Sequence, residues 1–136
     1  MPTFNSVSIG NAGEFFAASV LQREFKTIAF ASSQSSYDLI AEDYNGKFFK
    51  CQVKTTQYPK QISNYRYWRW RTVRHKNVIY KNSDIDFFAL VALDANLVYF
   101  CLPEDMKGVI FYRREDRLDV DIESQSCARV LEKLCE

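Results

Sequence analysis

Short apolar runs separated by turn signals dominate the middle of the chain and predict a series of β-strands. Phe87–Leu93 is almost continuously apolar, which is typical of a central strand buried on both faces. Asp94–Asn96 predicts a turn into a second apolar run, Leu97–Leu102, which Pro103 ends. A shorter run, Thr27–Ala31, predicts a further strand nearer the N-terminus. These runs indicate a sheet with at least one strand in its interior.

Apolar residues at helical spacing mark the two ends of the chain. From about Ser8 to Phe25 they fall mostly on one face, and Ser8 or Asn11 would serve as the N-cap. The tail, residues 123–136, repeats the helical pattern. Glu14 would lie in the first helical turn, where the helix dipole favours a carboxylate. We therefore predict an α/β domain, with a mixed sheet of about five strands flanked by an N-terminal and a C-terminal helix.

The stretch Ser36–Thr56 predicts a β-hairpin. Two apolar runs flank an Asn-Gly pair, which is the strongest short-range signal for a two-strand turn. Asp38 would lie near the open end of the first strand, with Gln52 and Lys54 on the second. Residues two apart in a strand point to the same face. We therefore expect a carboxylate, an amide oxygen and an ammonium group to converge at this end of the hairpin.

Such a set of groups suits a divalent cation and a phosphate. Hydrolysis of a phosphodiester needs a hard cation, which neutralises developing charge and lowers the pKa of the attacking water. Mg²⁺ prefers oxygen ligands and takes only one or two carboxylates from the protein. Lys54 would then orient the water or stabilise the charge on phosphorus. The alternative is an ordinary cross-strand ion pair between Asp38 and Lys54 on a sheet surface.

These residues resemble the signature of the PD-(D/E)xK nuclease superfamily, with Asp38, a turn, and then Gln52-Val53-Lys54-Thr55. The chain is most similar there to the group I intron-associated homing endonucleases and the archaeal Holliday-junction-resolvase-like branch. The likeness extends upstream to Gly10–Glu14 and is clearest in the N-terminal part of the chain. Two positions depart from the signature: Tyr37 stands where it has proline, and Gln52 where it has Asp or Glu.

The resemblance implies a restriction-endonuclease-like fold and Mg²⁺-dependent cleavage of DNA, with Mn²⁺ as a substitute for Mg²⁺. It places catalytic roles on Asp38, Gln52, Lys54 and Glu14, and metal ligation on Asp38, Gln52, Val53 and Glu14. Gln52 removes one negative charge, although an amide carbonyl still ligates a hard cation. Similar glutamine variants among intron-encoded members favour an active enzyme. Helix-dipole compensation is the other interpretation of Glu14.

Three functions follow from this likeness. Homing or restriction-like cleavage of double-stranded DNA is the first. Cleavage of branched DNA by a structure-specific nuclease is the second. The third belongs to another class: a nucleic-acid-binding module whose site is degenerate because of Gln52.

Positive charge is concentrated in the middle of the chain, although the net charge is only +1. Lys47–Lys81 contains ten Lys or Arg and no Asp or Glu, while the chain from Glu104 onward is net acidic. A basic stripe of this kind is typical of a protein that follows a phosphate backbone. In Tyr65–Arg71, arginines alternate with tryptophans, which predicts a strand with a basic face. That face is either a DNA contact or simply solvated. The expected DNA contacts are Thr55, Arg66, Arg69, Arg71, Arg74 and Lys76.

The chain as a whole is expected to form one domain, residues 1–136. It has no apolar run of membrane-spanning length and no signal peptide, which predicts a cytoplasmic or nucleoid-associated protein. Its four cysteines lack a CxxC spacing and there is one histidine, which argues against zinc. One small domain reads few base pairs. We therefore expect a homodimer or higher homo-oligomer on double-stranded or branched DNA.

Overall fold

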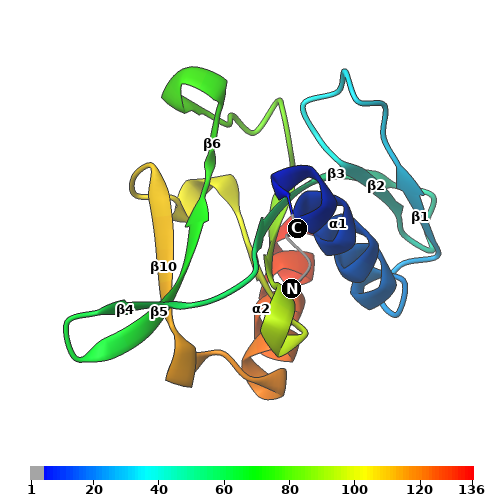
Figure 1. Cartoon of the computed structure of the whole chain (residues 1–136). Coiled ribbons are helices and arrows are strands. Elements are labelled where there is room, and N and C mark those ends of the chain that lie inside the picture. The colour runs from blue at the N-terminus through cyan, green and yellow to red at the C-terminus, as the bar shows by residue number, and fades with distance from the viewer. Residues whose placement is uncertain (1–4) are drawn as a thin grey trace.

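The computed structural model describes residues 5–136 and contains one five-stranded mixed sheet, two α-helices and two smaller sheets (Figure 1). Along the chain the elements are α1 (Ser6–Leu21), β1 (Thr27–Phe30), β2 (Leu39–Glu42), β3 (Phe48–Thr56), β4 (Lys60–Ile62), β5 (Tyr65–Arg71), β6 (Val73–Arg74), β7 (Val78–Ile79), β8 (Phe87–Ala92), β9 (Leu97–Cys101), β10 (Ile110–Arg114) and α2 (Val120–Leu134).

The main sheet has the strand order β1-β2-β3-β8-β9. Strands β3 and β8 run parallel, and every other neighbouring pair is antiparallel. All residues of β8 are buried, as expected for a strand that has a neighbour on each side and a covered face above and below. The mixed five-stranded sheet and the α/β class predicted from the sequence are therefore confirmed.

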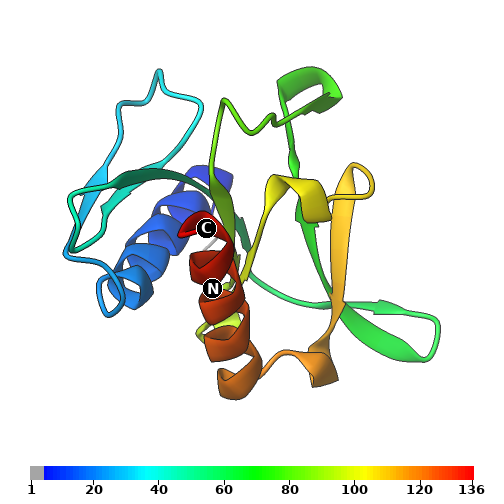
Figure 2. The ribbon, with the colours of Figure 1, turned by 180° about the vertical axis from the view of Figure 1, so that it is seen from behind.

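Both faces of the main sheet are covered. On one face, α1 and α2 share a core with alternate residues of β3 and β8, among them Ala17 of α1, Val53 of β3 and Val130 of α2. On the other face, Phe88 and Leu90 of β8 belong to a second core that contains the tryptophans of β5. In Figure 2, which views the molecule from behind, α2 lies in front of the main sheet.

The predicted hairpin forms from β2 and β3, with Leu39 opposite Cys51. Gly46 in the connecting turn has a φ of +81°, a conformation that glycine adopts at no steric cost. Asp43 stabilises the same turn because its Oδ1 accepts hydrogen bonds from the backbone N–H groups of Asn45 and Lys47, each at 2.9 Å. The Asn-Gly signal therefore identified the turn correctly.

Helix α1 starts and ends earlier than the sequence pattern indicated. Its N-cap is Asn5, whose side chain accepts a hydrogen bond from the backbone N–H of Ser8 at 2.8 Å, so neither Ser8 nor Asn11 caps the helix. Its first turn contains no acidic residue. The expectation that Glu14 lies in the first turn is wrong, because the helix begins at Ser6 and Glu14 lies two turns further along.

A second sheet, in the order β10-β5-β4, was not predicted. The strand Tyr65–Arg71 forms as expected, and its tryptophans attach this sheet to the main one: Trp68 and Trp70 are 2% and 1% exposed. The indole N–H of Trp70 donates to the Val91 carbonyl of β8 at 2.9 Å. Strands β6 and β7 form a separate two-stranded ribbon, labelled at β6 in Figure 1.

Helix α2 begins three residues before the predicted start, because Asp119 caps it by accepting from the backbone N–H of Ile122 at 2.8 Å. It packs along β9 at the edge of the main sheet. The described chain contains two α-helices, α1 with 16 residues and α2 with 15. Neither is long and apolar enough to cross a membrane.

Candidate active site

The fold places the carboxylate of Asp38 directly beside β3. Strand β2 pairs with β3 as far as Leu39. One residue earlier, the backbone N–H of Asp38 donates to the Cys51 carbonyl at 2.9 Å, and Asp38 Oδ2 accepts from the backbone N–H of Val53 at 2.8 Å. The side chain of Asp38 thus occupies the place of the next ladder partner. Its position is determined by the backbone of β3 rather than by a free surface rotamer.

Two further polar groups, a backbone carbonyl and a side-chain amide, lie at the same point of β3. In a strand, the N–H and C=O of one residue point to the same neighbour, so the Val53 carbonyl faces the side of β3 that carries Asp38. The side-chain amide of Gln52 lies against this carbonyl, with Nε2 at 3.5 Å from the Val53 oxygen. Gln52 is 9% exposed. The structure therefore brings Gln52, Val53 and Asp38 together.

Glu14 reaches this site because α1 lies unusually close to β3. A Cβ added at Gly13 would lie 1.8 Å from Oγ1 of Thr55, so only glycine permits the observed distance between the two elements. Burial raises the pKa of Glu14, and the charge of Asp38 raises it further. Glu14 is too far from the helix N-terminus to compensate the helix dipole, whose effect is confined to the first turn. Its position favours the interpretation in which Glu14 faces Asp38.

Burial also raises the pKa of Asp38, although the hydrogen bond from Val53 and the charge of Lys54 act in the opposite direction. The charge of Asp38 thus lies close enough to disfavour the ionised form of Glu14, a half-buried carboxylate on a separate element. A cation held between them would reverse that effect, because a positive charge favours ionisation of both.

The ammonium group of Lys54 is held by residues that follow β5 in the chain. Its Nζ donates to the Tyr80 hydroxyl at 3.1 Å and lies 3.4 Å from the Val73 carbonyl oxygen. It also lies 5.0 Å from the centre of the Tyr80 ring. Burial lowers the pKa of Lys54, while the charge of Asp38 acts to raise it. In the described chain, Lys54 is therefore anchored by Tyr80 and Val73 rather than paired with Asp38.

Burial, together with the charge of Asp38, raises the pKa of Tyr80 to about 12. The hydroxyl therefore keeps its proton at neutral pH and offers an oxygen lone pair to the Lys54 ammonium. Arg74 also contacts this ring, with its guanidinium carbon 5.9 Å from the Tyr80 ring centre. Tyr80 is thus the side chain that links the candidate site to the β6–β7 ribbon.

The donor atoms fit a hard divalent cation. Within residues 5–136, no three carboxylate, thiol or imidazole side chains are close enough to hold a metal ion. A cation at this site would therefore take two carboxylates, one backbone carbonyl and one amide, which are the oxygen ligands that Mg²⁺ accepts. These groups belong to Glu14, Asp38, Val53 and Gln52. With Gln52 in place of an acidic residue, the site has one negative charge fewer, but the side chain still has a carbonyl oxygen that can bind the cation.

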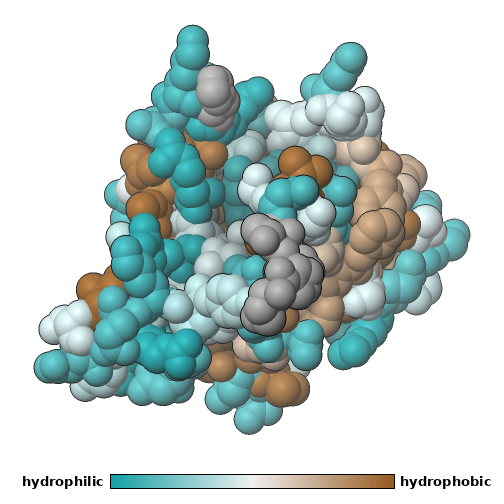
Figure 3. Space-filling model, viewed as in Figure 1, coloured by the Kyte–Doolittle hydropathy of each residue, from teal (hydrophilic) through white to brown (hydrophobic). Residues whose placement is uncertain are grey.

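A groove of about 500 Å³ follows directly from the end of β3. Three of the predicted DNA contacts line it, namely Thr55, Arg69 and Arg71. We call it the basic groove; its remaining lining residues are Thr56, Tyr58, Lys60, Tyr67 and Ile110. Hydrophilic residues predominate over the part of the surface formed by β4, β5 and β10 (Figure 3). The basic groove therefore leads away from Lys54 along a surface suited to phosphates.

The other predicted DNA contacts lie elsewhere. Arg66 points to the opposite side of β5 from Arg69, where its Nε lies 3.6 Å from the Glu115 carboxylate. Arg74 and Lys76 are exposed on the β6–β7 ribbon, and Arg74 pairs with Asp84 at 3.7 Å. The structure thus separates Arg66 from the basic groove and places Arg74 and Lys76 beyond Tyr80.

Sequence reasoning missed two residues of this region, Lys60 and Tyr80. Lys60 lies within the basic stretch of the chain, so the signal for it was present. Tyr80 lies 26 residues from the lysine that it contacts, and no local pattern indicates such a contact. The close approach at Gly13 was equally invisible, because it depends on how α1 packs against β3.

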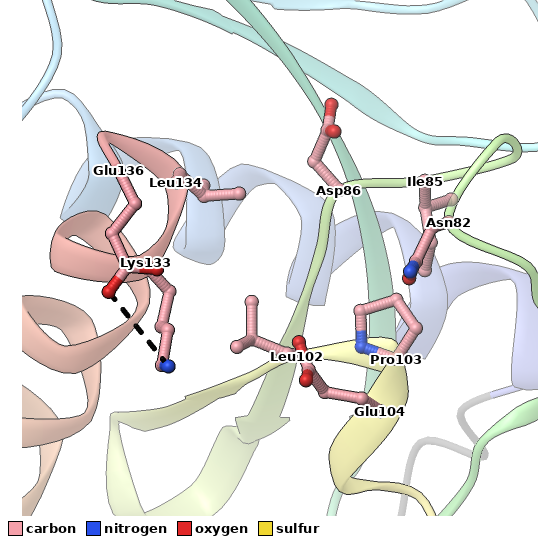
Figure 4. A pocket seen from close by; sticks show the side chains of 9 residues that line it. All are labelled: Asn82, Ile85, Asp86, Leu102, Pro103, Glu104, Lys133, Leu134 and Glu136. Atoms are coloured by element: carbon pink, nitrogen blue, oxygen red, sulfur yellow. Dashed lines mark ion pairs between the residues drawn. The ribbon is translucent and has the colours of Figure 1, made fainter.

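A separate cavity of about 260 Å³ lies at the C-terminal end of α2 (Figure 4). Three carboxylates line it, those of Asp86, Glu104 and Glu136, together with Lys133, which pairs with Glu136 at 4.0 Å. Asp86 Oδ2 also accepts from the backbone N–H of Lys50 at 2.7 Å. The described residues that line this cavity include none of the predicted site residues, and their net negative charge does not suit DNA.

Comparison with known proteins agrees with this geometry. A family model described as PD-(D/E)XK endonuclease matches residues 4–129. The structure of a bacterial homing endonuclease, I-Ssp6803I, matches 81% of this chain and 78% of its own with a TM-score of 0.63 and 18% identity. At that identity the likeness concerns the fold, and it confirms the expected restriction-endonuclease-like architecture. No curated protein matches the chain.

Proposed function

Since this chain belongs to the PD-(D/E)XK endonuclease family, we propose that it is a metal-dependent DNA endonuclease that acts as one domain over residues 1–136. Nucleases of this family typically use divalent metals. We assign Mg²⁺ as the cofactor, with Mn²⁺ as a substitute. The observation that carries the proposal is the convergence of Glu14 and Asp38, from separate elements, on β3 beside the half-buried side chain of Lys54.

In this proposal each residue has one task. The carboxylates of Asp38 and Glu14, the Val53 carbonyl and the Gln52 amide hold the cation. Bound there, Mg²⁺ supplies positive charge to the scissile phosphate and lowers the pKa of the attacking water. Lys54 orients that water or stabilises the charge that develops on the phosphate oxygens. Tyr80 keeps the ammonium of Lys54 in position through its hydroxyl.

The DNA backbone would leave the site along the basic groove, where Thr55, Arg69 and Arg71 contact phosphates, with further contacts from Arg74 and Lys76 on the ribbon. The position of Arg66 on the other side of β5 gives it no part in the groove itself. Double-strand cleavage of the homing or restriction type is our first assignment, and cleavage of branched DNA is the second. A homodimer or higher oligomer would bring two such sites to the two strands.

The test is cleavage of a supercoiled plasmid and of a four-way junction in the presence of Mg²⁺, Mn²⁺ or EDTA. We expect cutting by the wild type with either metal and none in EDTA. Asp38→Asn keeps an acceptor for the Val53 N–H but removes the charge, so it should slow cutting at least about 100-fold. The preferred substrate decides between the two assignments.

Asp86→Asn is the matched control. Asp86 is also half-buried and also accepts a backbone N–H of β3, that of Lys50 at 2.7 Å, but it lies outside the candidate site. We expect this variant to cut like the wild type. Equal cutting by Asp38→Asn and wild type would contradict the proposal, and DNA binding without cutting by the wild type would favour a non-catalytic binding module.

A further inference from the structure

The second sheet has one face that does not pack on the core. Residues opposite each other in an antiparallel pair point to the same side, so the register identifies every residue on this face. On β5 these are Tyr65, Tyr67, Arg69 and Arg71, which alternate with the buried tryptophans. Their partners are Lys60 and Ile62 on β4, and Ile110, Tyr112 and Arg114 on β10.

Only basic and uncharged residues make up this face, and all its aromatic side chains are tyrosines. Tyr65 and Tyr112 are 47% and 48% exposed. A sheet that buries tryptophans on one side and presents exposed tyrosines on the other leaves a large aromatic area open to solvent. Exposed aromatic rings interleaved with arginine are the arrangement with which sheet surfaces bind nucleic acid bases.

The tyrosines line a groove of about 380 Å³ together with Ile62 and the turn residues Ser63 and Asn64. We call it the tyrosine groove. The rings of Tyr67 and Tyr112 are perpendicular, with centroids 6.3 Å apart, so they form a corner rather than a closed stack. Tyr67 lines both the tyrosine groove and the basic groove. The two grooves are therefore adjacent on one surface.

Two arginines lie over rings of this face. The guanidinium carbon of Arg114 lies 3.6 Å from the ring centre of Tyr65, and a bidentate bond to the carboxylate of Asp116, at 2.7 and 3.0 Å, orients it. The guanidinium carbon of Arg69 lies 5.9 Å from the ring centre of Tyr112. Tyr65 and Tyr112 thus already contact flat guanidinium groups, and each of these two rings has a positive charge beside it.

We propose that the tyrosine groove binds unpaired nucleotides of the DNA substrate by stacking. In duplex DNA the flat faces of the bases are hidden within the stack, and a protein reaches only their edges. An unpaired nucleotide exposes the face that a tyrosine ring can cover. The inference rests on the proposed function in that phosphates follow the basic groove, and it deepens it: of the two assigned substrates it favours branched DNA, with a single-stranded segment that reaches the tyrosine groove, over a fully paired duplex site.

The experiment uses DNA with 2-aminopurine, a fluorescent base whose emission falls when it stacks. A duplex with a short single-stranded tail carries the probe in the tail, and a fully paired duplex of equal length serves as the reference. Binding is measured in Ca²⁺ or EDTA, so the result does not depend on cleavage. We expect loss of 2-aminopurine emission on binding and about tenfold tighter binding of the tailed duplex.

Tyr65→Ala and Tyr112→Ala should each remove most of the quenching and of the preference, because they remove a stacking surface. Tyr65→Phe should retain both, because the ring remains. Tyr44→Ala is the matched control: Tyr44 is 75% exposed but lies in the β2–β3 turn, away from both grooves. Binding of the fully paired duplex should be nearly the same for all four variants.

Equal affinity for tailed and paired DNA, or unchanged quenching in both alanine variants, would overturn the proposal. Neither result would affect the proposed nuclease, which Mg²⁺-dependent cutting tests separately. Light scattering tests whether the tyrosine groove is instead an interface between copies of the chain. If Tyr65→Ala dissociates an oligomer while leaving the binding of tailed DNA unchanged, the tyrosine groove is an interface between copies of the chain and the proposal is wrong.

Discussion

Gly13 determines how closely α1 approaches β3. Any other residue would place its Cβ 2.8 Å from the Cβ of Thr55, an atom fixed to the backbone of β3. Gly13→Ala should therefore push the helix outward and lower the free energy of unfolding by about 1–3 kcal/mol, as overpacking in a core does. It should also slow cleavage, because Glu14 moves away from Asp38. Urea unfolding and the plasmid assay measure the two effects.

Gly10→Ala is the control on the same helix. A Cβ at Gly10 meets nothing within 4 Å, and alanine is the better helix former by about 1 kcal/mol. This variant should be as stable as the wild type or more so, with unchanged cleavage. If the two alanine variants unfold at the same urea concentration, α1 shifts freely and Gly13 does not set its distance from β3.

At this scale the sequence predicts residues whose signal is local. Asp38, Gln52 and Lys54 were recognised because a hairpin turn and a two-residue spacing bring them together within a single hairpin. The carboxylate of Glu14 was recognised only through a family resemblance, and its assigned position in the helix was wrong. Tyr80 was missed because its contact with Lys54 spans 26 residues. Such contacts follow from packing, which no short pattern encodes.

At the scale of elements, α2 protects an edge of the main sheet. Strand β9 has no neighbour on its outer side in the described chain, and side chains of α2 take the place of a strand. Glu123 Oε2 accepts from the backbone N–H of Val98 at 2.8 Å, and Ser126 Oγ accepts from that of Phe100 at 3.0 Å. These bonds satisfy donors that would otherwise pair with another chain.

Ser126→Ala should therefore destabilise the protein. The hydroxyl is buried, and its loss leaves the buried N–H of Phe100 without an acceptor. We expect a loss of about 1–3 kcal/mol in the free energy of unfolding, measured by urea denaturation, with an unchanged m-value. Ser124→Ala, on the exposed side of the same helix, should change it by less than about 0.5 kcal/mol. Similar values for both would mean that Ser126 does not protect the edge.

The elements themselves were predicted better than their assembly. The strands of the main sheet and both helices follow from apolar runs and helical spacing, which are local properties of the chain. The second sheet was not predicted, because β5 pairs with β10 across a long separation, with Ile110 opposite Arg71. Its attachment depends on Trp68 and Trp70. The sequence predicted that they lie on the apolar face of a strand, but not that this face packs against β8.

At the scale of the whole molecule, the site carries a cost in stability. The pKa values of Glu14 and Asp38 are raised from 4.5 and 3.8, first by burial. The folded protein therefore binds protons more firmly than the unfolded chain, and its free energy of unfolding falls as the pH rises through the raised values. Above the raised pKa values both carboxylates are ionised and the fold bears the full penalty.

This penalty predicts how charge removal and metal act on thermal unfolding. At pH 7, Asp38→Asn should raise the melting temperature by a few degrees, and the gain should vanish below the ordinary pKa of 3.8, where the carboxyl is protonated in both states. A lower melting temperature for Asp38→Asn at pH 7 would mean that its ionised carboxylate stabilises the fold.

Magnesium should relieve the same penalty in the unaltered protein. A cation that binds the folded chain and not the unfolded one raises the melting temperature with its concentration. We expect millimolar Mg²⁺ to stabilise the wild type at pH 7, and Glu14→Gln and Asp38→Asn each to reduce that effect, because each removes one of the two charged ligands. Calorimetry without DNA measures this independently of cleavage. If Mg²⁺ stabilises all three proteins equally, the cation binds elsewhere, and the two carboxylates are not its ligands.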